Sequence, residues 1–161
     1  MLFRIKLFNF LLLFVNFNVY SQEQIPLKIV DGIVTFESVA IIDSLSGSEI
    51  HERTLNWIGS YFKDAESVIK SNTPSRIVGD FIIYYDIGLV NADYKQTMTI
   101  DIKDGKMKFV VSAFGIDAWL LKSGGTEWRT NYPKIKNDVQ TKLNALYQSL
   151  LKDVYSSTSD W

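Results

Sequence analysis

The chain has 161 residues, of which 47% are hydrophobic and 22% are charged, and its formal net charge at pH 7 is −1. These values are ordinary for a globular protein. The absence of cysteine excludes disulfide bonds, a Cys/His zinc cluster and a cysteine nucleophile.

Residues 1–21 have the pattern of a secretory signal peptide. Arg4 and Lys6 precede an apolar run over residues 7–15, and Ser21 is the small residue before the expected cleavage. The run is well short of the roughly 20 apolar residues that cross a bilayer, which makes an uncleaved membrane anchor the weaker alternative. No cysteine at the cleavage point can accept a lipid. We therefore expect a periplasmic or secreted protein.

Cleavage after Ser21 would leave residues 22–161, with 15 basic and 18 acidic residues and a net charge of −3. About 140 residues suffice for one domain that buries roughly two-thirds of its unfolded surface. The segment contains no internal repeat, charge block, low-complexity linker or further membrane-spanning stretch. It is therefore expected to be a single domain, held together by its core alone.

The first expected strand spans residues 32–42, where β-branched residues are frequent. Apolar residues occupy both of its alternating sets, so the strand is either buried on both sides or carries a bulge. In the helix that follows, Ser46 and Glu49 have the spacing of a capping box. Leu45 and Ile50 occupy the positions of a hydrophobic staple. The apolar stripe of this helix, with Trp57 as its expected main anchor, comprises Ile50, Thr54, Trp57, Ile58 and Tyr61.

A short strand is expected over residues 67–71, followed by a turn at residues 72–75, where Pro74 stops regular pairing. The next strand spans residues 76–86. One of its faces contains Gly79, where a neighbouring group is expected to approach closely. The other members of that face are Ile77, Phe81, Ile83 and Tyr85, and the opposite face carries Val78, Asp80, Ile82 and Tyr84.

Residues 94–114 form an expected hairpin, because their apolar residues alternate on both sides of Asp104-Gly105. A two-residue turn there sets Ile100 opposite Phe109 and Asp101 opposite Lys108. A four-residue turn would give the same pairing. A three-residue turn would set Ile100 against Lys108 and move one apolar set to the wrong face, so we reject it.

A non-regular connection is expected over residues 115–131, followed by a helix over residues 133–154 with Pro133 in its first turn. The apolar stripe of this helix comprises Ile135, Val139, Leu143, Leu146, Leu150 and Val154. The expected fold is therefore α+β, a five-stranded antiparallel sheet with element order β-α-β-β-β-β-α and two helices packed on one face. The other face is left to solvent or to a partner.

Several of these positions together resemble a known family over about residues 32–114. They are Gly32, Val34, Phe36, Trp57, Gly79, Ile100, Ile102, Asp104, Gly105 and Lys106. The chain resembles the bacterial domain of unknown function family 4468, which is exported, uncharacterised and has a TATA-binding-protein-like fold. The resemblance supports the order of strands and helices and implies no activity.

No catalytic residue, metal site or cofactor is assigned from the sequence. His51 lies off the apolar stripe of its helix and is expected to be solvated, and a Ser-His-Asp triad would require it at a cleft. Asp104 is explained as the residue before Gly105 in the turn, and Asp101 as the cross-strand partner of Lys108. We therefore favour a non-enzymatic protein. The alternative is a carboxylate-based hydrolase of envelope or glycan substrates, which would need two acidic side chains converging in a cleft.

The candidate binding surface is the uncovered face of the sheet. Its expected contact residues are Lys95, Thr97, Thr99, Asp101 and Lys108, joined by Trp119, Trp128 and Tyr132 of the connection. The aromatic residues form either a lid over the core or part of a recognition surface, since Trp and Tyr are frequent at binding hot spots. We expect a binding module of the cell envelope, with a protein or another envelope ligand as its partner. Nucleic acid is not expected, because the exposed face has mixed charge.

Overall fold

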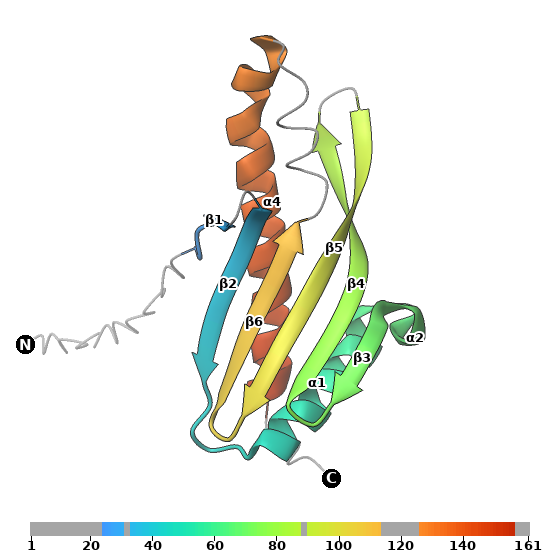
Figure 1. Ribbon diagram of the computed structural model, residues 1–161, viewed down its shortest axis with the longest axis vertical. Helices are drawn as coiled ribbons and strands as arrows, with labels where there is room; N and C mark the ends of the chain where they lie inside the picture. Colours follow the sequence, from blue (N-terminus) through green and yellow to red (C-terminus); the bar gives the residue numbers. More distant parts are fainter. Residues whose placement is uncertain (1–23, 31–32, 88–89, 114–125, 157–161) are drawn as a thin grey trace, which may run out of the picture.

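The computed structural model describes residues 24–30, 33–87, 90–113 and 126–156. Their elements are β1 (Lys28–Val30), β2 (Ile33–Ile41), α1 (Gly47–Tyr61), α2 (Ala65–Val68), β3 (Ile69–Thr73), β4 (Arg76–Ile87), β5 (Val90–Lys103), β6 (Lys106–Ala113) and α4 (Thr126–Tyr155). The strands form one antiparallel sheet in the order β1-β2-β6-β5-β4-β3 (Figure 1). The predicted signal peptide, residues 1–21, lies outside the described residues.

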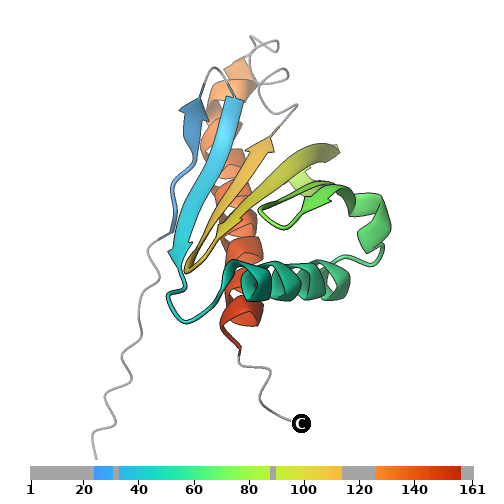
Figure 2. The ribbon, with the colours of Figure 1, turned by 60° about the horizontal axis from the view of Figure 1, so that its bottom comes forward.

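The predicted α+β class and antiparallel sheet are confirmed, and α1 and α4 lie on the same side of the sheet (Figures 1 and 2). The five predicted strands are present. The sheet gains a sixth, β1, whose three residues are too few to show an alternating pattern. None of the described helices is long and apolar enough to cross a membrane.

Two boundaries differ from the prediction, one because of a local helix cap and the other because a helix continues across a proline. The strand predicted over residues 67–71 begins only at Ile69, because Asp64 caps the short helix α2 by accepting from the Ser67 amide at 3.1 Å. Helix α4 begins at Thr126, seven residues before Pro133. A proline suits a first helical turn because its missing amide is not needed there. Inside α4 it removes one backbone donor, and the helix continues across it.

The register of the β5–β6 hairpin is as predicted. Ile100 is opposite Phe109 and Asp101 is opposite Lys108, across the two-residue turn Asp104-Gly105. Gly105 has φ = 71°, a left-handed conformation that costs other residues roughly 1–2 kcal/mol. The alternation of the two strands therefore determined the pairing correctly.

The tip of this hairpin is fastened to the start of α1. The Asp104 carboxylate accepts from the Gly47 amide at 2.7 Å, and the Gly105 amide donates to the Leu45 carbonyl at 3.0 Å. The predicted capping box is also present, with Ser46 and Glu49 exchanging hydrogen bonds. Asp104 thus places a negative charge at a helix N-terminus, where it is favourable. The turn residues of the family-like segment have a structural role in this protein.

The core lies between the sheet and the two long helices. The rings of Phe36, Phe109 and Tyr147 meet at centroid distances of 5.4 to 6.0 Å and join β2, β6 and α4. Trp57 of α1 is 1% exposed, as expected of an anchor. The predicted close approach at Gly79 is confirmed, because a Cβ atom there would lie 3.1 Å from the Val68 carbonyl oxygen. Of the predicted α4 stripe, Val139, Leu143, Leu146, Leu150 and Val154 are buried.

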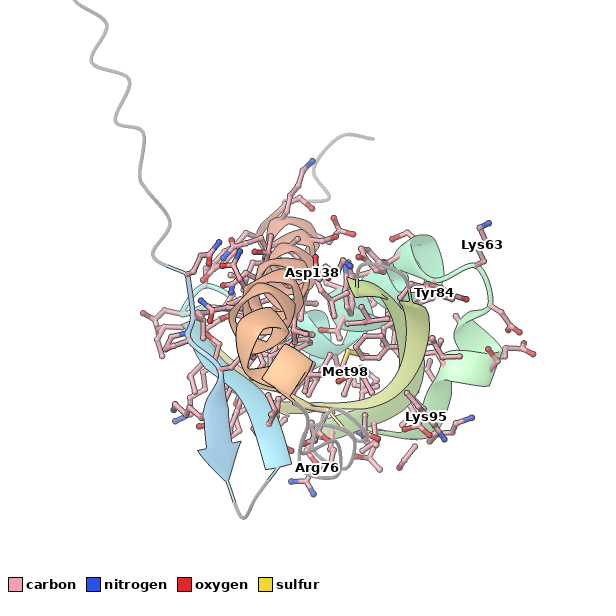
Figure 3. All side chains as sticks on the ribbon, turned by 90° about the horizontal axis from the view of Figure 1, so that it is seen from above. Lys63, Arg76, Tyr84, Lys95, Met98 and Asp138 are labelled. Atoms are coloured by element: carbon pink, nitrogen blue, oxygen red, sulfur yellow. The ribbon has the colours of Figure 1, made fainter. Side chains whose placement is uncertain are left out.

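The sheet is strongly curved, and the helices occupy its concave side. Figure 3 shows Met98 inside the curve and Arg76 on the outer side, while the far ends of β4 and β5 bend toward α4. Lys142 of α4 donates to the Tyr84 carbonyl at 2.8 Å and joins that end to the helix. The face that the helices leave uncovered, called the open face below, is therefore convex.

Side-chain contacts to backbone groups hold both ends of the described chain. Asn144 accepts from the Ile25 amide at 2.9 Å and donates to the Ile25 carbonyl at 3.1 Å, which ties the N-terminal segment to α4. Arg53 donates to the carbonyls of Val154 and Ser156 at 2.8 and 3.0 Å. Its positive charge lies at the C-terminus of α4, where the helix dipole favours a cation.

Candidate functional site

The register of the strands arranges the side chains of the open face in rows. Val39, Lys108, Asp101 and Arg76 form one row, because each is opposite the next across β2, β6, β5 and β4. The row toward the β5–β6 turn contains Ile41, Lys106 and Lys103. On the other side follow a row of Glu37, Val110, Thr99 and Val78 and a row of Thr35, Ser112, Thr97 and Asp80.

Three carboxylates of the open face form ion pairs. Arg76 pairs with Asp101, Lys95 Nζ lies 2.8 Å from Asp80, and Lys108 Nζ lies 3.3 Å from Glu37. Asp101 is the cross-strand partner of Lys108, as predicted, but the ion pairs of both residues are with other strands. Asp101 pairs with Arg76 of β4, and Lys108 pairs with Glu37 of β2. These pairs are partly exposed, so solvent screens them and each adds little to the stability of the fold.

Asp80 is the most strongly bound of these carboxylates. It accepts from the Thr97 hydroxyl at 2.8 Å in addition to its pair with Lys95, and it borders a hollow of about 350 Å³ between α2 and β4. Hydrogen bonds from Lys95 and then Thr97 lower the pKa of Asp80 below its ordinary value of 3.8. An aspartate that stays ionised in this way is a poor general acid.

Acid should remove the contribution of Asp80 to stability. Because the folded-state pKa is lowered, the contribution is present above the ordinary value of 3.8 and is lost as pH falls through the folded value. We expect the difference in unfolding free energy between wild type and Asp80→Asn to be constant near neutral pH and to shrink below about pH 4. Denaturant unfolding at several pH values measures it. Thr97→Val removes one of the two donors to Asp80, so its difference in unfolding free energy from wild type should depend less on pH than that of Asp80→Asn. If the difference between wild type and Asp80→Asn grew in acid, the role assigned to Asp80 would be contradicted.

A groove of about 680 Å³ runs over the part of the open face nearest the β5–β6 turn. It is lined by Val39, Thr73, Ser75, Arg76, Asp101, Ile102, Lys103, Lys106, Met107 and Lys108. Lys103 and Lys106 are directly opposite each other at its end, and within the described part of the chain neither forms an ion pair. Two like charges in such positions repel each other.

Large apolar side chains are also exposed on the open face. Val39 and Ile41 of β2 are 54% and 57% exposed, and Ile82 and Tyr84 of β4 are 53% and 67% exposed. This explains the two apolar sets of the first strand. Neither predicted alternative is correct, because β2 pairs with β6 without a register shift and its second apolar set faces outward instead of into a core.

The sequence predicted correctly which side chains of the hairpin lie on the open face, but it did not identify all the residues of that face. Lys95, Thr97, Thr99, Asp101 and Lys108 all lie on it, as predicted; their role in binding stays a prediction. The connection is corrected in part, since Trp128 and Tyr132 belong to α4, whereas Trp119 lies outside the described residues. The missed residues are Arg76, Lys103, Lys106, Val39 and Ile41. The hairpin register implies that Lys103 faces Lys106, which is the signal in the sequence that locates this pair.

Asp80 and Asp101, which border the two hollows of this face, do not converge on one site. Asp80 and Asp101 belong to rows four residues apart along β4, or about 13 Å at 3.3 Å per residue. Carboxyl pairs of glycosidases are closer, at most about 9.5 Å apart. His51 Nε2 lies 2.7 Å from Asn72 Oδ1 and joins α1 to β3. Within the described ranges, no group of three or more His, Asp or Glu side chains could hold a metal ion.

Two solved structures share this architecture. A TBP-like (TATA-binding-protein-like) protein from Parabacteroides distasonis superposes with a TM-score of 0.65 and 15% sequence identity, over 84% of this chain and 99% of that one. A DUF4468 family protein from Bacteroides ovatus superposes with a TM-score of 0.55 and 13% identity, over 84% of this chain and 94% of that one. No protein-family model and no curated protein matches the sequence. The protein therefore has the TBP-like fold, in agreement with the resemblance seen in its sequence.

Proposed function

We propose that the protein is an exported, non-enzymatic binding module of the cell envelope that contacts its partner through the open face. The observation that carries the proposal is the exposure of Val39, Ile41, Ile82 and Tyr84 on a face that neither long helix covers. Val39 and Ile41 lie near the β5–β6 turn, and Ile82 and Tyr84 lie toward the other end of the face. Exposed apolar side chains with polar neighbours are a mark of interaction sites. Export is supported by the signal-like pattern of residues 1–21. The fold itself carries no function.

The absence of enzymatic activity is supported by how the acidic side chains are used. Glu37, Asp80 and Asp101 each neutralise a cation of the open face. The carboxylate of Asp104 binds the Gly47 amide. These contacts give each of the four acids a structural role, whereas the alternative, a carboxylate-based hydrolase, requires two acids that meet at one substrate.

Replacing Thr99 with arginine is expected to abolish partner binding. Thr99 lies in the middle of the open face, between Val110 and Val78, and a long charged side chain can extend from it into solvent without disturbing the core. We expect Thr99→Arg to fold normally but to recover at least about tenfold less partner from envelope extract after cross-linking, as measured by quantitative mass spectrometry.

The matched control is Asn56→Arg, which adds the same charge to an exposed position of α1. It should recover the partner as wild type does. Equal recovery by Thr99→Arg and Asn56→Arg would refute the open face as the contact surface.

A further inference from the structure

We infer that Lys103 and Lys106 form a binding site for a phosphomonoester, carried by a ligand whose apolar part lies against Val39 and Ile41. The inference rests on the proposed function, because it names the chemistry that the open face would recognise. It concerns the end of the groove next to the β5–β6 turn and uses none of the ion-paired carboxylates.

Among the described cations of β4, β5 and β6, the ion pairs leave out two lysines, Lys103 and Lys106. Lys95, Lys108 and Arg76 each have a carboxylate partner. Lys103 and Lys106 have none among the described residues, although the register sets them opposite each other. Asp104, next to Lys103 in the chain, directs its carboxylate to the Gly47 amide, 2.7 Å away. Two facing cations are therefore left at one end of the groove.

A phosphomonoester fits this pair better than a carboxylate does. Opposite residues in an antiparallel pair have Cα atoms about 5.5 Å apart or closer, so both flexible ammonium groups can reach one anion. Together they carry two positive charges, and a phosphomonoester carries up to two negative charges at pH 7. A carboxylate carries one, and the carboxylate-matching guanidinium of the groove, on Arg76, already binds Asp101.

The surroundings of the lysine pair add hydroxyl groups and an apolar surface. Thr73 and Ser75 line the same groove. Ile41 is opposite Lys106 in the register, and Val39 lies two residues away on the same face of β2. Both aliphatic side chains are more than half exposed. The volume of about 680 Å³ lies within the range of small-molecule sites. In a phosphate with an attached alkyl chain, the phosphate would therefore contact the two lysines while the chain contacts Val39 and Ile41.

The test titrates the purified protein with two probes, inorganic phosphate and n-hexyl phosphate. Binding is measured from the chemical shifts of the backbone amides by NMR. Acetate at equal ionic strength is the control anion. We expect saturable shifts centred on residues 103–106 with both phosphates, and about tenfold tighter binding of hexyl phosphate because its chain buries apolar surface. Lys103→Gln combined with Lys106→Gln should weaken both by about tenfold or more. Ile41→Ser should reduce only the preference for hexyl phosphate.

A control variant, Lys63→Gln combined with Lys152→Gln, removes two exposed lysines elsewhere and should bind as wild type does. The lysine-pair variant should be at least as stable as wild type, because a repulsion is removed, and this separates lost binding from lost folding. Absence of saturable phosphate shifts, an equal response to acetate, or unchanged affinity in the lysine-pair variant would overturn the inference.

Vesicles distinguish the two sources of such a ligand. Tighter binding to phosphatidylcholine vesicles containing phosphatidic acid than to hexyl phosphate would assign a membrane lipid, and the reverse would assign a soluble ligand. Thr99→Arg should leave phosphate binding intact, since Thr99 is four residues, about 13 Å, from Lys103 along β5. Loss of partner recovery with intact phosphate binding, or the opposite, therefore separates this inference from the proposed function.

Discussion

Replacing Trp57 with alanine is expected to lower the free energy of unfolding by about 4 kcal/mol, within the range for large-to-small changes in a core. The side chain is 1% exposed, and its ring lies 5.4 Å from that of Tyr61 and 5.8 Å from that of Phe62. Its indole N–H donates to the Ser149 hydroxyl of α4 at 3.1 Å. The change removes both the packing and the link between the helices, and urea unfolding measures its cost.

Two companion variants separate these contributions. Trp57→Phe keeps most of the apolar volume but loses the donor to Ser149, and its cost should be clearly smaller. Asn56→Ala, at the exposed neighbouring position, should change stability by less than about 0.5 kcal/mol. A loss below about 1.5 kcal/mol for Trp57→Ala would contradict its role as the anchor of α1.

Replacing Asn144 with alanine should cost about 3 kcal/mol of unfolding free energy. The side chain is buried and exchanges two hydrogen bonds with the Ile25 backbone, at 2.9 and 3.1 Å, while donating to the Gln140 carbonyl at 2.8 Å. Each lost bond removes roughly 1 kcal/mol, and a backbone group left buried without a partner adds more. Denaturant unfolding measures the loss, and hydrogen exchange at the Ile25 amide should accelerate in the folded protein.

The chemistry at Asn144 can be tested by isosteric replacement. Asn144→Asp keeps an acceptor for the Ile25 amide but loses the donor for the two carbonyls, so it should also be destabilising near neutral pH. Asn137→Ala, at an exposed position of the same helix, serves as the control. If Asn144→Ala were as stable as Asn137→Ala, the N-terminal segment would not depend on this side chain.

The sequence by itself determined the features that depend on neighbouring residues. The alternation of residues 94–113 decided which side of the hairpin is buried, and with the Asp-Gly turn it fixed every pairing of β5 with β6. The capping box at Ser46 and Glu49 and the Trp57 anchor were likewise readable, because helix starts and stripes repeat over a few residues.

Only the tertiary structure decided which distant strands meet. Lys108 pairs with Glu37, and Asp101 with Arg76, because β2 and β4 flank the hairpin. The exposure of Val39 and Ile41 follows from the position of β2 beside β6, with both helices on the opposite, concave side. An alternating pattern states how a strand divides its side chains between two faces. Which elements cover each face, and which charges become neighbours, depends on contacts between segments far apart in the chain.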